Sequence, residues 1–304
     1  MILDPKVGVI EQLGQKNRQD LIGLAALDWP LAKIHQARSW LQTGEISEAD
    51  LRLMPLAMIE KLSISDYQVK TAKKFFSEYN FASFLEWLAD QEIRVSCEAE
   101  KDYPQLLREL DSHPAVLWHR GHWPVRPELV AVVGTRHPSL PGIVMTQNLV
   151  TEIVSLGLGV VSGFMFGSDQ VAQQQALKVG GWSVGVLGFG LNKIYPASFF
   201  TLTRIFLDQG GTLVSPFPPW TVPQKWRFLE RNKIVAGLAK AVIVTEALPR
   251  SGTHTTVTAA ADLGRLAGVL PSAKASLFYP GAKVLLDEGV SLVENVAEFL
   301  KADK

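Results

Sequence analysis

The sequence predicts an α/β protein in which a small helical domain precedes a doubly wound parallel sheet. Short uncharged runs of β-branched residues end at glycine or hydroxyl residues, as buried parallel strands do. Stretches with helical periodicity separate these runs, at the length that right-handed crossovers need. Residues 1 to about 95 contain helical periodicities but no convincing strand, which predicts the helical domain.

The helical domain is predicted to span residues 1–95. Apolar residues recur at helical spacing in "IHQARSWL", "EADLRLMPLAMIEKL" and "VKTAKKFFSEYNFASFLEWLADQ", and short polar or proline-containing turns join these stretches. The pattern changes to alternating strands and helices after "PAVLWHRG". Residues 96–304 are therefore predicted to form a second domain around the sheet.

Six strands are predicted in the second domain. They are residues 130–133, 159–162, 183–187, 212–215, 241–245 and 268–270. The carboxyl ends of parallel strands meet at one edge of the sheet, where ligands of open α/β sheets bind. The loops that follow the strands are therefore expected to carry the binding residues.

Composition narrows the class of protein. The 304 residues, 47% of them hydrophobic, suffice for a large core. The single cysteine, Cys97, excludes a disulfide framework, and no signal peptide opens the chain, so a soluble protein of the reducing cytoplasm is expected. The longest uncharged stretches, residues 153–168 and 179–192, contain several glycines and are shorter than the roughly 20 apolar residues of a membrane helix. No membrane partner is expected.

The formal net charge of zero hides a segregation of charge along the chain. Residues 130–270 contain eleven lysines and arginines against six acidic residues, a net charge of +5. The rest of the chain carries the compensating negative charge. The basic segment is the one with the glycine loops, which favours a polyanionic partner there.

The loop in "VAVVGTRHPSLPG" follows the first predicted strand. Thr135, Arg136 and Ser139 come after Gly134, and a helix that starts near Gly142 would offer unpaired backbone N–H groups to an anion. These residues are therefore predicted to bind phosphate. A surface turn with an incidental arginine fits the same residues, and neither G-x-G-x-x-G nor a Walker motif is present.

The loop in "VVSGFMFGSDQVAQQQAL" follows the second predicted strand. Ser162 and Gly163 end the strand, and Gly167 permits a tight turn. Ser168 or Asp169 is expected to cap a helix that starts at Gln170.

The loop in "VIVTEALPRSGTHTTVTAAA" gives the third candidate. Ser251, Gly252 and Thr253 precede a predicted helix and offer hydroxyl and backbone N–H groups to an anion. The same residues are ordinary N-cap chemistry. The coincidence of three such loops on one sheet edge favours a binding site.

A basic helix, "QKWRFLERNKIVAGLAKA", gives a fourth candidate. Arg227 and Arg231 lie one turn apart on one face. Cations interleaved with aromatic rings are typical of single-strand grooves, in which charges follow phosphates and rings stack on bases. A solvated amphipathic helix with core aromatics is the alternative. The residues concerned are Lys225, Trp226, Arg227, Phe228, Arg231 and Lys233.

No catalytic set and no metal site is predicted. The six histidines show no metal-ligand spacing with one another or with Cys97. Glu246, at the end of a strand, could act as a base, but no partner for it can be named. No cofactor is therefore expected.

Six motifs, in order, resemble those of the DNA-processing protein A (DprA/Smf) family. They run from about Glu98 to Gly289 and read "YPQLLRELDSHPAVLWHRG", "VAVVGTRHPS", "VVSGFMFGSDQVAQQQAL", "VGVLGFGLNKIYP", "FLERNKIVAGLAKAVIVTEALPRSGTHTTVTAA" and "YPGAKVLLDEG". The resemblance implies an extended Rossmann fold that binds single-stranded DNA, forms a homodimer and loads a RecA-type recombinase during natural transformation, without enzymatic activity. The N-terminal region is similar in position only to the family's sterile-alpha-motif-like domain.

The resemblance also assigns site residues. Arg136 would hold a backbone phosphate of DNA, and Arg231, Asn232 and Lys233 match the family's basic R-N-[RK] motif. The nucleic-acid-binding residues expected from all these features are Gly134, Thr135, Arg136, Ser139, Ser162, Gly163, Phe166, Gly167, Lys225, Arg227, Arg231, Asn232, Lys233, Ser251, Gly252 and Thr253.

Three positions in the second loop depart from the family pattern. Phe166 stands where the family usually has arginine, Ser168 where it has isoleucine, and Gln173 where it has histidine. The loop has therefore lost a cation. Because Phe164 and Met165 already make it apolar, the Phe166 ring is expected to be buried against the sheet edge.

Two other function classes remain open. A nucleotide-processing enzyme of the related phosphoribohydrolase class would carry P-G-G-x-G-T-x-x-E, whereas "PRSGTHTT" has no glutamate at the matching place. A degenerate adaptor would keep the fold and the dimer without binding DNA. Loss of the loop arginine favours the adaptor, and retention of Arg136, Arg231 and Lys233 opposes it.

Overall fold

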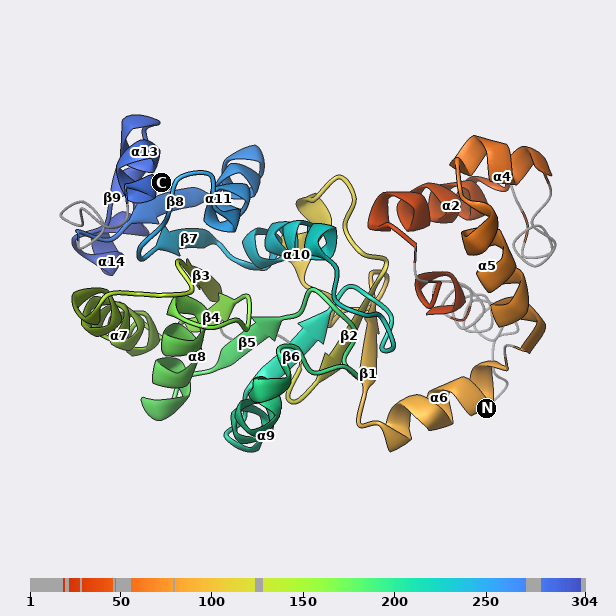
Figure 1. The fold of residues 1–304 in the computed structure, drawn as a ribbon, viewed down its shortest axis with the longest axis horizontal. Helices are drawn as coiled ribbons and strands as arrows, with labels where there is room; N and C mark the ends of the chain where they lie inside the picture. Colours follow the sequence, from red (N-terminus) through yellow and green to blue (C-terminus); the bar gives the residue numbers. More distant parts are fainter. Residues whose placement is uncertain are drawn as a thin grey trace, which may run out of the picture.

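The computed structural model describes residues 19, 22–27, 29–45, 47, 56–78, 80–123, 128–271 and 280–301. The expected helical domain of residues 1–95 therefore lies partly outside the described residues. In Figure 1 the helices of the N-terminal part form a group at one end of the molecule, and the sheet with its helices occupies the other.

One mixed sheet organises the second part. Its strands, in spatial order, are β1 (Arg94–Cys97), β2 (Val116–Arg120), β6 (Thr212–Ser215), β5 (Ser183–Val186), β4 (Gly159–Ser162), β3 (Leu129–Val133), β7 (Ala241–Val244), β8 (Leu266–Val269) and β9 (Ser291–Leu292). Parallel pairing runs without interruption from β6 to β9. This is the doubly wound Rossmann-like arrangement that the sequence predicts.

The six predicted strands are confirmed within one or two residues, but the sheet is not wholly parallel. At one edge β2 pairs antiparallel with β6, and β1 pairs antiparallel with β2. The sequence pattern missed these two strands and β9, which has two residues. The expected domain boundary at residue 95 falls within β1.

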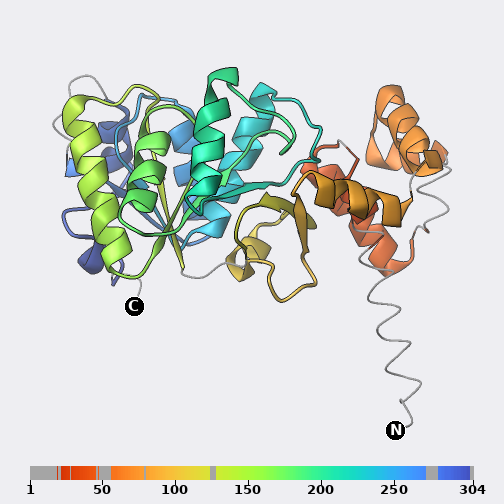
Figure 2. The same ribbon diagram turned by 90° about the horizontal axis from the view of Figure 1, so that it is seen from below.

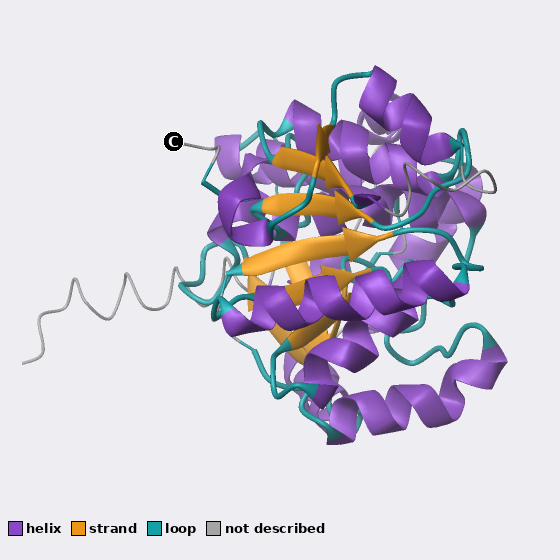
Figure 3. Cartoon of the chain, turned by 90° about the vertical axis from the view of Figure 1, so that its left-hand side faces the viewer, coloured by secondary structure: helices purple, strands orange, loops and turns teal. Residues whose placement is uncertain are grey.

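Helices cover both faces of the sheet, as Figure 3 shows. In Figure 2 the helices that follow β3, β4 and β5 lie side by side. The helices of the sheet part are α7 (Leu140–Ser155), α8 (Ser168–Lys178), α9 (Phe200–Asp208), α10 (Lys225–Leu238), α11 (Gly252–Asp262), α13 (Gly281–Asp287) and α14 (Val296–Phe299), with 3-10 turns η1 (Gln105–Glu109) and η2 (Ala197–Phe199).

Strand β3 shows why both faces must be covered. Val130 and Val132 pack against α7 and α8, whereas Ala131 and Val133 pack against α10 and α11. All four side chains are buried. A strand that is apolar on both sides reads as an unbroken apolar run in the sequence, which is why this strand was predicted.

The N-terminal part has a core of its own and a polar contact with the sheet part. Its helices are α2 (Leu31–Thr43), α4 (Leu56–Leu62), α5 (Asp66–Glu78) and α6 (Phe81–Asp90), and residues from Leu24 to Ala72 form a separate apolar cluster. Arg38 on α2 pairs with Glu98, which also lies 3.0 Å from Nε2 of His113. Apolar contacts also join the two parts, because Phe84 and Trp87 of α6 pack in one cluster with Trp118 and Trp220. We propose that the two parts are separate domains held together by this ion pair and this apolar cluster.

Within the described residues, no helix combines the length and the hydropathy that crossing a lipid bilayer requires.

Replacing Leu129 on β3 by alanine tests the role of the central strand. The Leu129 side chain is 1% exposed in the main core, so Leu129→Ala should lower the free energy of unfolding by about 2–5 kcal/mol through lost burial and a residual cavity. Urea denaturation measures the change. The matched control is Leu140→Ala, because Leu140 is 80% exposed and its loss should cost no more than about 0.5 kcal/mol. Equal losses in the two variants would contradict this account of the core.

Candidate functional site

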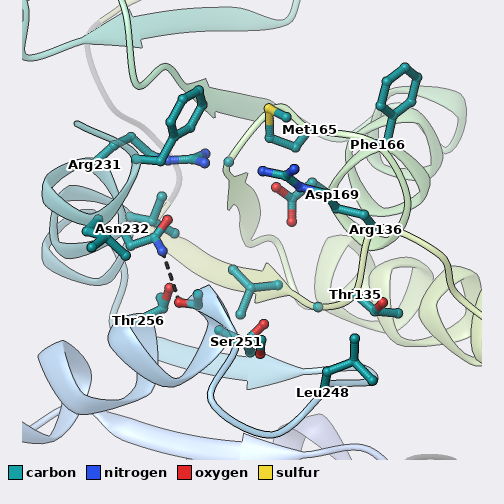
Figure 4. Close-up of a pocket in the computed structure, with 18 of the residues that line it drawn as sticks. Thr135, Arg136, Met165, Phe166, Asp169, Arg231, Asn232, Leu248, Ser251 and Thr256 are labelled. Carbon is teal, nitrogen blue, oxygen red and sulfur yellow. Dashed lines mark hydrogen bonds between the residues drawn. The ribbon is translucent and has the colours of Figure 1, made fainter. Parts of the chain in front are cut away.

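A pocket of about 440 Å³ opens at the carboxyl edge of the sheet. It lies where the chain order reverses, because β4 and β7 flank β3 on opposite sides. Such switch points are where open α/β sheets bind ligands. The lining residues, most of them drawn in Figure 4, are Val133, Gly134, Thr135, Arg136, His137, Gly163, Met165, Phe166, Asp169, Lys225, Phe228, Leu229, Arg231, Asn232, Val235, Leu248, Ser251, Gly252, Thr253 and Thr256.

The loop after β3 supplies one of the exposed cations of the pocket. Its backbone is fixed by the Thr135 N–H, which donates to the Glu246 carbonyl at 2.7 Å. The Thr135 hydroxyl accepts from the backbone N–H of His137, so it is used within the turn. Arg136 is exposed and lines the pocket, as expected for a phosphate-binding residue.

The N-terminus of α7 already holds a carboxylate of the protein. Glu246 accepts hydrogen bonds from the Ser139 N–H at 2.8 Å and from the Ser139 hydroxyl at 2.7 Å. Ser139 also caps the helix by accepting from the Gly142 N–H. The expectation that this helix N-terminus and Ser139 are open to a phosphate is therefore corrected. The sequence allowed no partner of Glu246 to be named, and the structure shows that Ser139 is its hydrogen-bond partner.

The loop after β4 packs against the loop after β3. Gly167 has φ +83°, and a Cβ there would collide with the Thr135 carbonyl and the Arg136 backbone. The Ser168 N–H donates to the Thr135 carbonyl at 3.0 Å. The two loops therefore form one unit, and only glycine fits where they meet.

Helix α8 is not capped as predicted. It begins at Ser168, its N-cap is Gly167, and no side chain caps it. The Ser168 hydroxyl accepts from Thr245 instead, at 2.8 Å. Asp169, expected to cap the helix, lies in the first turn and contributes its carboxylate to the pocket.

Asp169 and Arg231 bring opposite charges together at the bottom of the pocket. Both are buried, and an Arg231 Nη1 donates to the Val186 carbonyl at 3.0 Å. Burial raises the pKa of Asp169. The positive charge of Arg231 opposes this rise most strongly, and the charge of Arg136 opposes it less. Burial lowers the pKa of Arg231 to about 10, so it stays charged at neutral pH.

Gly163 makes room for this charge pair. A Cβ at Gly163 would collide with the Arg231 guanidinium and with the Asp169 carboxylate. In Figure 4 the Asp169 carboxylate lies beside the Arg136 guanidinium, and the Arg231 guanidinium points toward them from the other side of the pocket. Two cations against one carboxylate leave the pocket with a positive charge, and Arg136 is the exposed one of the two.

Helix α10 directs its arginines inward. Arg227 is buried, donates to the Val222 carbonyl at 2.6 Å and lies over the Trp226 ring, 4.9 Å from its centroid. It does not line the pocket. Lys225 is exposed and does line it, whereas Lys233 is exposed on the same helix outside the lining.

The loop after β7 brings the N-terminus of α11 to the pocket. Ser251 is the N-cap, and its side chain caps no backbone N–H. Its buried Oγ has no hydrogen-bond partner among the described residues. Gly252 is held by Asn232, whose Nδ2 donates to the Gly252 carbonyl at 2.9 Å (Figure 4). A hydroxyl without a partner beside a helix N-terminus is suited to an anionic or polar ligand.

The position of Phe166 differs from the expected one. Phe164 and Met165 are buried, but Phe166 is 41% exposed and lines the pocket. Phe164 has a positive φ of 50° in this loop. The prediction that the Phe166 ring is buried against the sheet edge is therefore wrong.

The structure brings most of the predicted site residues together. Five lie outside the pocket lining, namely Ser139, Ser162, Gly167, Arg227 and Lys233. Ser162 is committed to the Val132 carbonyl at 2.7 Å. The lining also includes residues that the sequence did not indicate, among them His137, Leu229, Leu248 and Thr256. His137 directly follows Arg136 in a loop that the sequence had indicated, whereas Leu229 and Leu248 are apolar residues that no local pattern marks as part of a site.

The polar side chains of the pocket are mainly cationic and hydroxyl groups. Asp169 is the one carboxylate among the described lining residues, and it faces two arginines. In the described part of the chain, no group of three or more histidine, cysteine, aspartate or glutamate side chains gathers closely enough to hold a metal ion. Cationic, hydroxyl and aromatic groups together suit a ligand with phosphates and flat apolar faces.

Comparisons with known proteins agree with this chemistry. The profile of the family described as DNA recombination-mediator protein A matches residues 94–303. Smf of Synechocystis is 31% identical over 81% of this chain, and Smf of Escherichia coli is 33% identical over 77%. These matches span 65% and 63% of the two relatives' own lengths. DprA of Bacillus subtilis is 31% identical, over 67% of this chain and 69% of its own.

Two solved structures have the same fold. DNA processing protein A of Streptococcus pneumoniae matches with a TM-score of 0.75 and 25% identity, over 93% of this chain and 96% of that one. The Helicobacter pylori protein, whose structure is described in terms of its single-stranded DNA binding mode, matches with a TM-score of 0.60 and 27% identity, over 69% and 95%.

Removing one member of the charge pair should destabilise the fold. Arg231→Met leaves the Asp169 carboxylate buried without its main counter-charge, so the free energy of unfolding should fall by about 3 kcal/mol. The double variant Asp169→Asn with Arg231→Met should recover most of this loss. Arg136→Met, which removes an exposed guanidinium, is the control and should change stability little. Chemical denaturation of the wild type and these three variants measures the loss of stability and its recovery, and wild-type stability of Arg231→Met would refute the prediction.

Glu230 on α10 should make stability depend on pH. Burial raises the pKa of Glu230 from 4.5 to about 7, and its buried Oε2 has no hydrogen-bond partner. The native state therefore keeps a proton that the unfolded chain releases above pH 4.5. This contribution to stability is complete below pH 4.5 and is lost as the pH rises through 7.

The Glu230→Gln variant, which stays neutral, should therefore gain stability relative to the wild type as the pH rises from about 4.5 to 7. Urea denaturation across this range measures the difference. Parallel profiles for the two proteins would show that Glu230 titrates normally.

Proposed function

Because this chain belongs to the DNA recombination-mediator protein A family, we propose that it binds single-stranded DNA in the pocket at the carboxyl edge of its sheet. The observation that carries the proposal is the exposed Arg136 on the β3 loop, facing the pocket together with Lys225 and the N-terminus of α11. These groups suit backbone phosphates, and phosphate contacts carry no base information. Binding is therefore expected to show little sequence preference.

The description of the family as recombination mediators supports a wider role. We propose that the chain protects incoming DNA and loads a RecA-type recombinase onto it during natural transformation, as a homodimer in the cytoplasm. A mediator needs no bond-breaking step, and Asp169, held between two arginines, is poorly placed as a general base. We accordingly propose that the protein is not an enzyme. Sustained consumption of AMP or ATP by the purified protein, lost in a pocket variant, would overturn this.

Arg136→Ala should weaken binding to single-stranded oligonucleotides of any sequence. Loss of a charge-assisted contact worth ~1.5–3 kcal/mol corresponds to a decrease in affinity of about tenfold or more. The slope of log K against log salt should become less steep by about 0.7, the value for one phosphate on a single strand. Fluorescence anisotropy at several salt concentrations measures both quantities.

The matched control is Arg204→Ala on α9, where the arginine side chain is 80% exposed and lies outside the pocket lining. It should bind like the wild type. Equal binding by the wild type and Arg136→Ala would show that the groove lies elsewhere. Salt-independent binding, a preference for duplex or no binding at all would overturn the proposed function and favour the adaptor.

A further inference from the structure

The ring of Phe166 has an unusual position for a phenylalanine. It is 41% exposed on the rim of a pocket that also contains the cations Arg136 and Lys225. Its two predecessors in the chain, Phe164 and Met165, are buried. In Figure 4 the Phe166 ring stands apart from Asp169 and Met165.

The Phe166 ring is supported from behind. Its centroid lies 4.4 Å from that of Phe199, with the two planes at 83°. Phe199 is itself buried and meets Phe164 edge to face, at 5.7 Å and 90°. An edge-to-face contact uses one side of a ring at most, so a face of Phe166 is left for another planar group.

The Phe166 ring is also coupled to the exposed cation. The next residue, Gly167, packs its backbone against Arg136, and the Ser168 N–H bonds to the Thr135 carbonyl. The joined loops therefore fix the backbones of Phe166 and Arg136 relative to each other, and both residues line the pocket. A flat apolar surface and a guanidinium in one pocket are complementary to a nucleotide, which joins a planar base to a phosphate.

We infer that Phe166 is a stacking platform for one base of the bound strand, next to the phosphate that Arg136 holds. This inference rests on the proposed function and adds a base contact to it. Stacking of a base on an aromatic side chain tolerates any sequence, because every base has a flat face. The site thereby holds a base that is not stacked on its neighbours in the strand. A single strand presents such a base without the free-energy cost of opening a duplex.

A protein partner is the competing occupant of an exposed ring. Phe200 on α9 is 65% exposed and follows Phe199 directly, so apolar surface continues beyond the pocket. Phe166, however, lines the pocket with Arg136, Lys225 and Arg231, and Phe200 does not. The cationic surroundings of Phe166 therefore favour a nucleotide.

The test compares the full-length wild type with Phe166→Ala, Phe166→Leu and Phe166→Trp, and with Phe200→Ala as the matched exposed phenylalanine. Each protein is titrated against an oligothymidylate and against an abasic strand of the same length. Phe166→Ala and Phe166→Leu should bind the oligothymidylate roughly 5- to 150-fold more weakly, the equivalent of ~1–3 kcal/mol for one stacked base. Phe166→Trp and Phe200→Ala should bind it at least as well as the wild type.

The abasic strand separates stacking from other effects. It should bind the wild type and Phe166→Ala with equal affinity, because it has no base to lose. A 2-aminopurine base in the strand should report stacking as quenching in the wild type and not in Phe166→Ala. Thermal unfolding of each variant shows whether the fold is kept.

Several outcomes would overturn the inference while leaving the proposed function intact. One is wild-type binding by Phe166→Ala to both strands. Another is full binding by Phe166→Leu, which would show that apolar bulk suffices and would assign the ring to packing or a protein contact. Failure of the wild type to bind any single strand would instead overturn the proposed function, and the platform with it.

Discussion

The buried charge pair of Asp169 and Arg231 is the constraint on which the site depends. It joins the first turn of α8 to the middle of α10, across the loop after β4. The two side chains fit there only because residue 163 is glycine. Two buried charges are stable only when each compensates the other. The pair therefore fixes the position of the loop after β4 relative to α10. Arg136 and Phe166 take their places around this fixed centre.

The parallel part of the sheet was predictable because its strands are apolar on both faces. Such strands appear as short uninterrupted runs, and β3 with Val130 to Val133 is an example. The antiparallel edge was not predictable in this way. β1 contains Arg94 and Ser96, and the short apolar run of β2 ends in the polar residues His119 and Arg120, so neither strand is apolar throughout. Pairing with β6, about a hundred residues later, makes β2 a strand.

The site was predictable as a set of loops but not in the direction of its side chains. Arg227 and Arg231 do share a face of α10, as their spacing indicates, but that face is turned to the interior. Helical spacing shows which residues share a face and not which way the face points. Similarly, Ser139 follows the pattern of an anion-binding helix N-terminus. Its anion is Glu246, 107 residues away in the chain, which local sequence could not indicate.

These internal contacts decide what kind of ligand the pocket can favour. Among the described helices that follow β3, β4 and β7, the N-terminus of α7 is occupied by Glu246, and that of α8 is joined to the Thr135 carbonyl. Of these three helices, α11, with the Ser251 hydroxyl, is left for a ligand. A compact polyphosphate needs several such donors converging on it. The phosphate-binding groups of the pocket are few, and apolar side chains such as Phe166, Phe228 and Leu248 line it with them. The pocket therefore suits a strand whose phosphates are separated by bases.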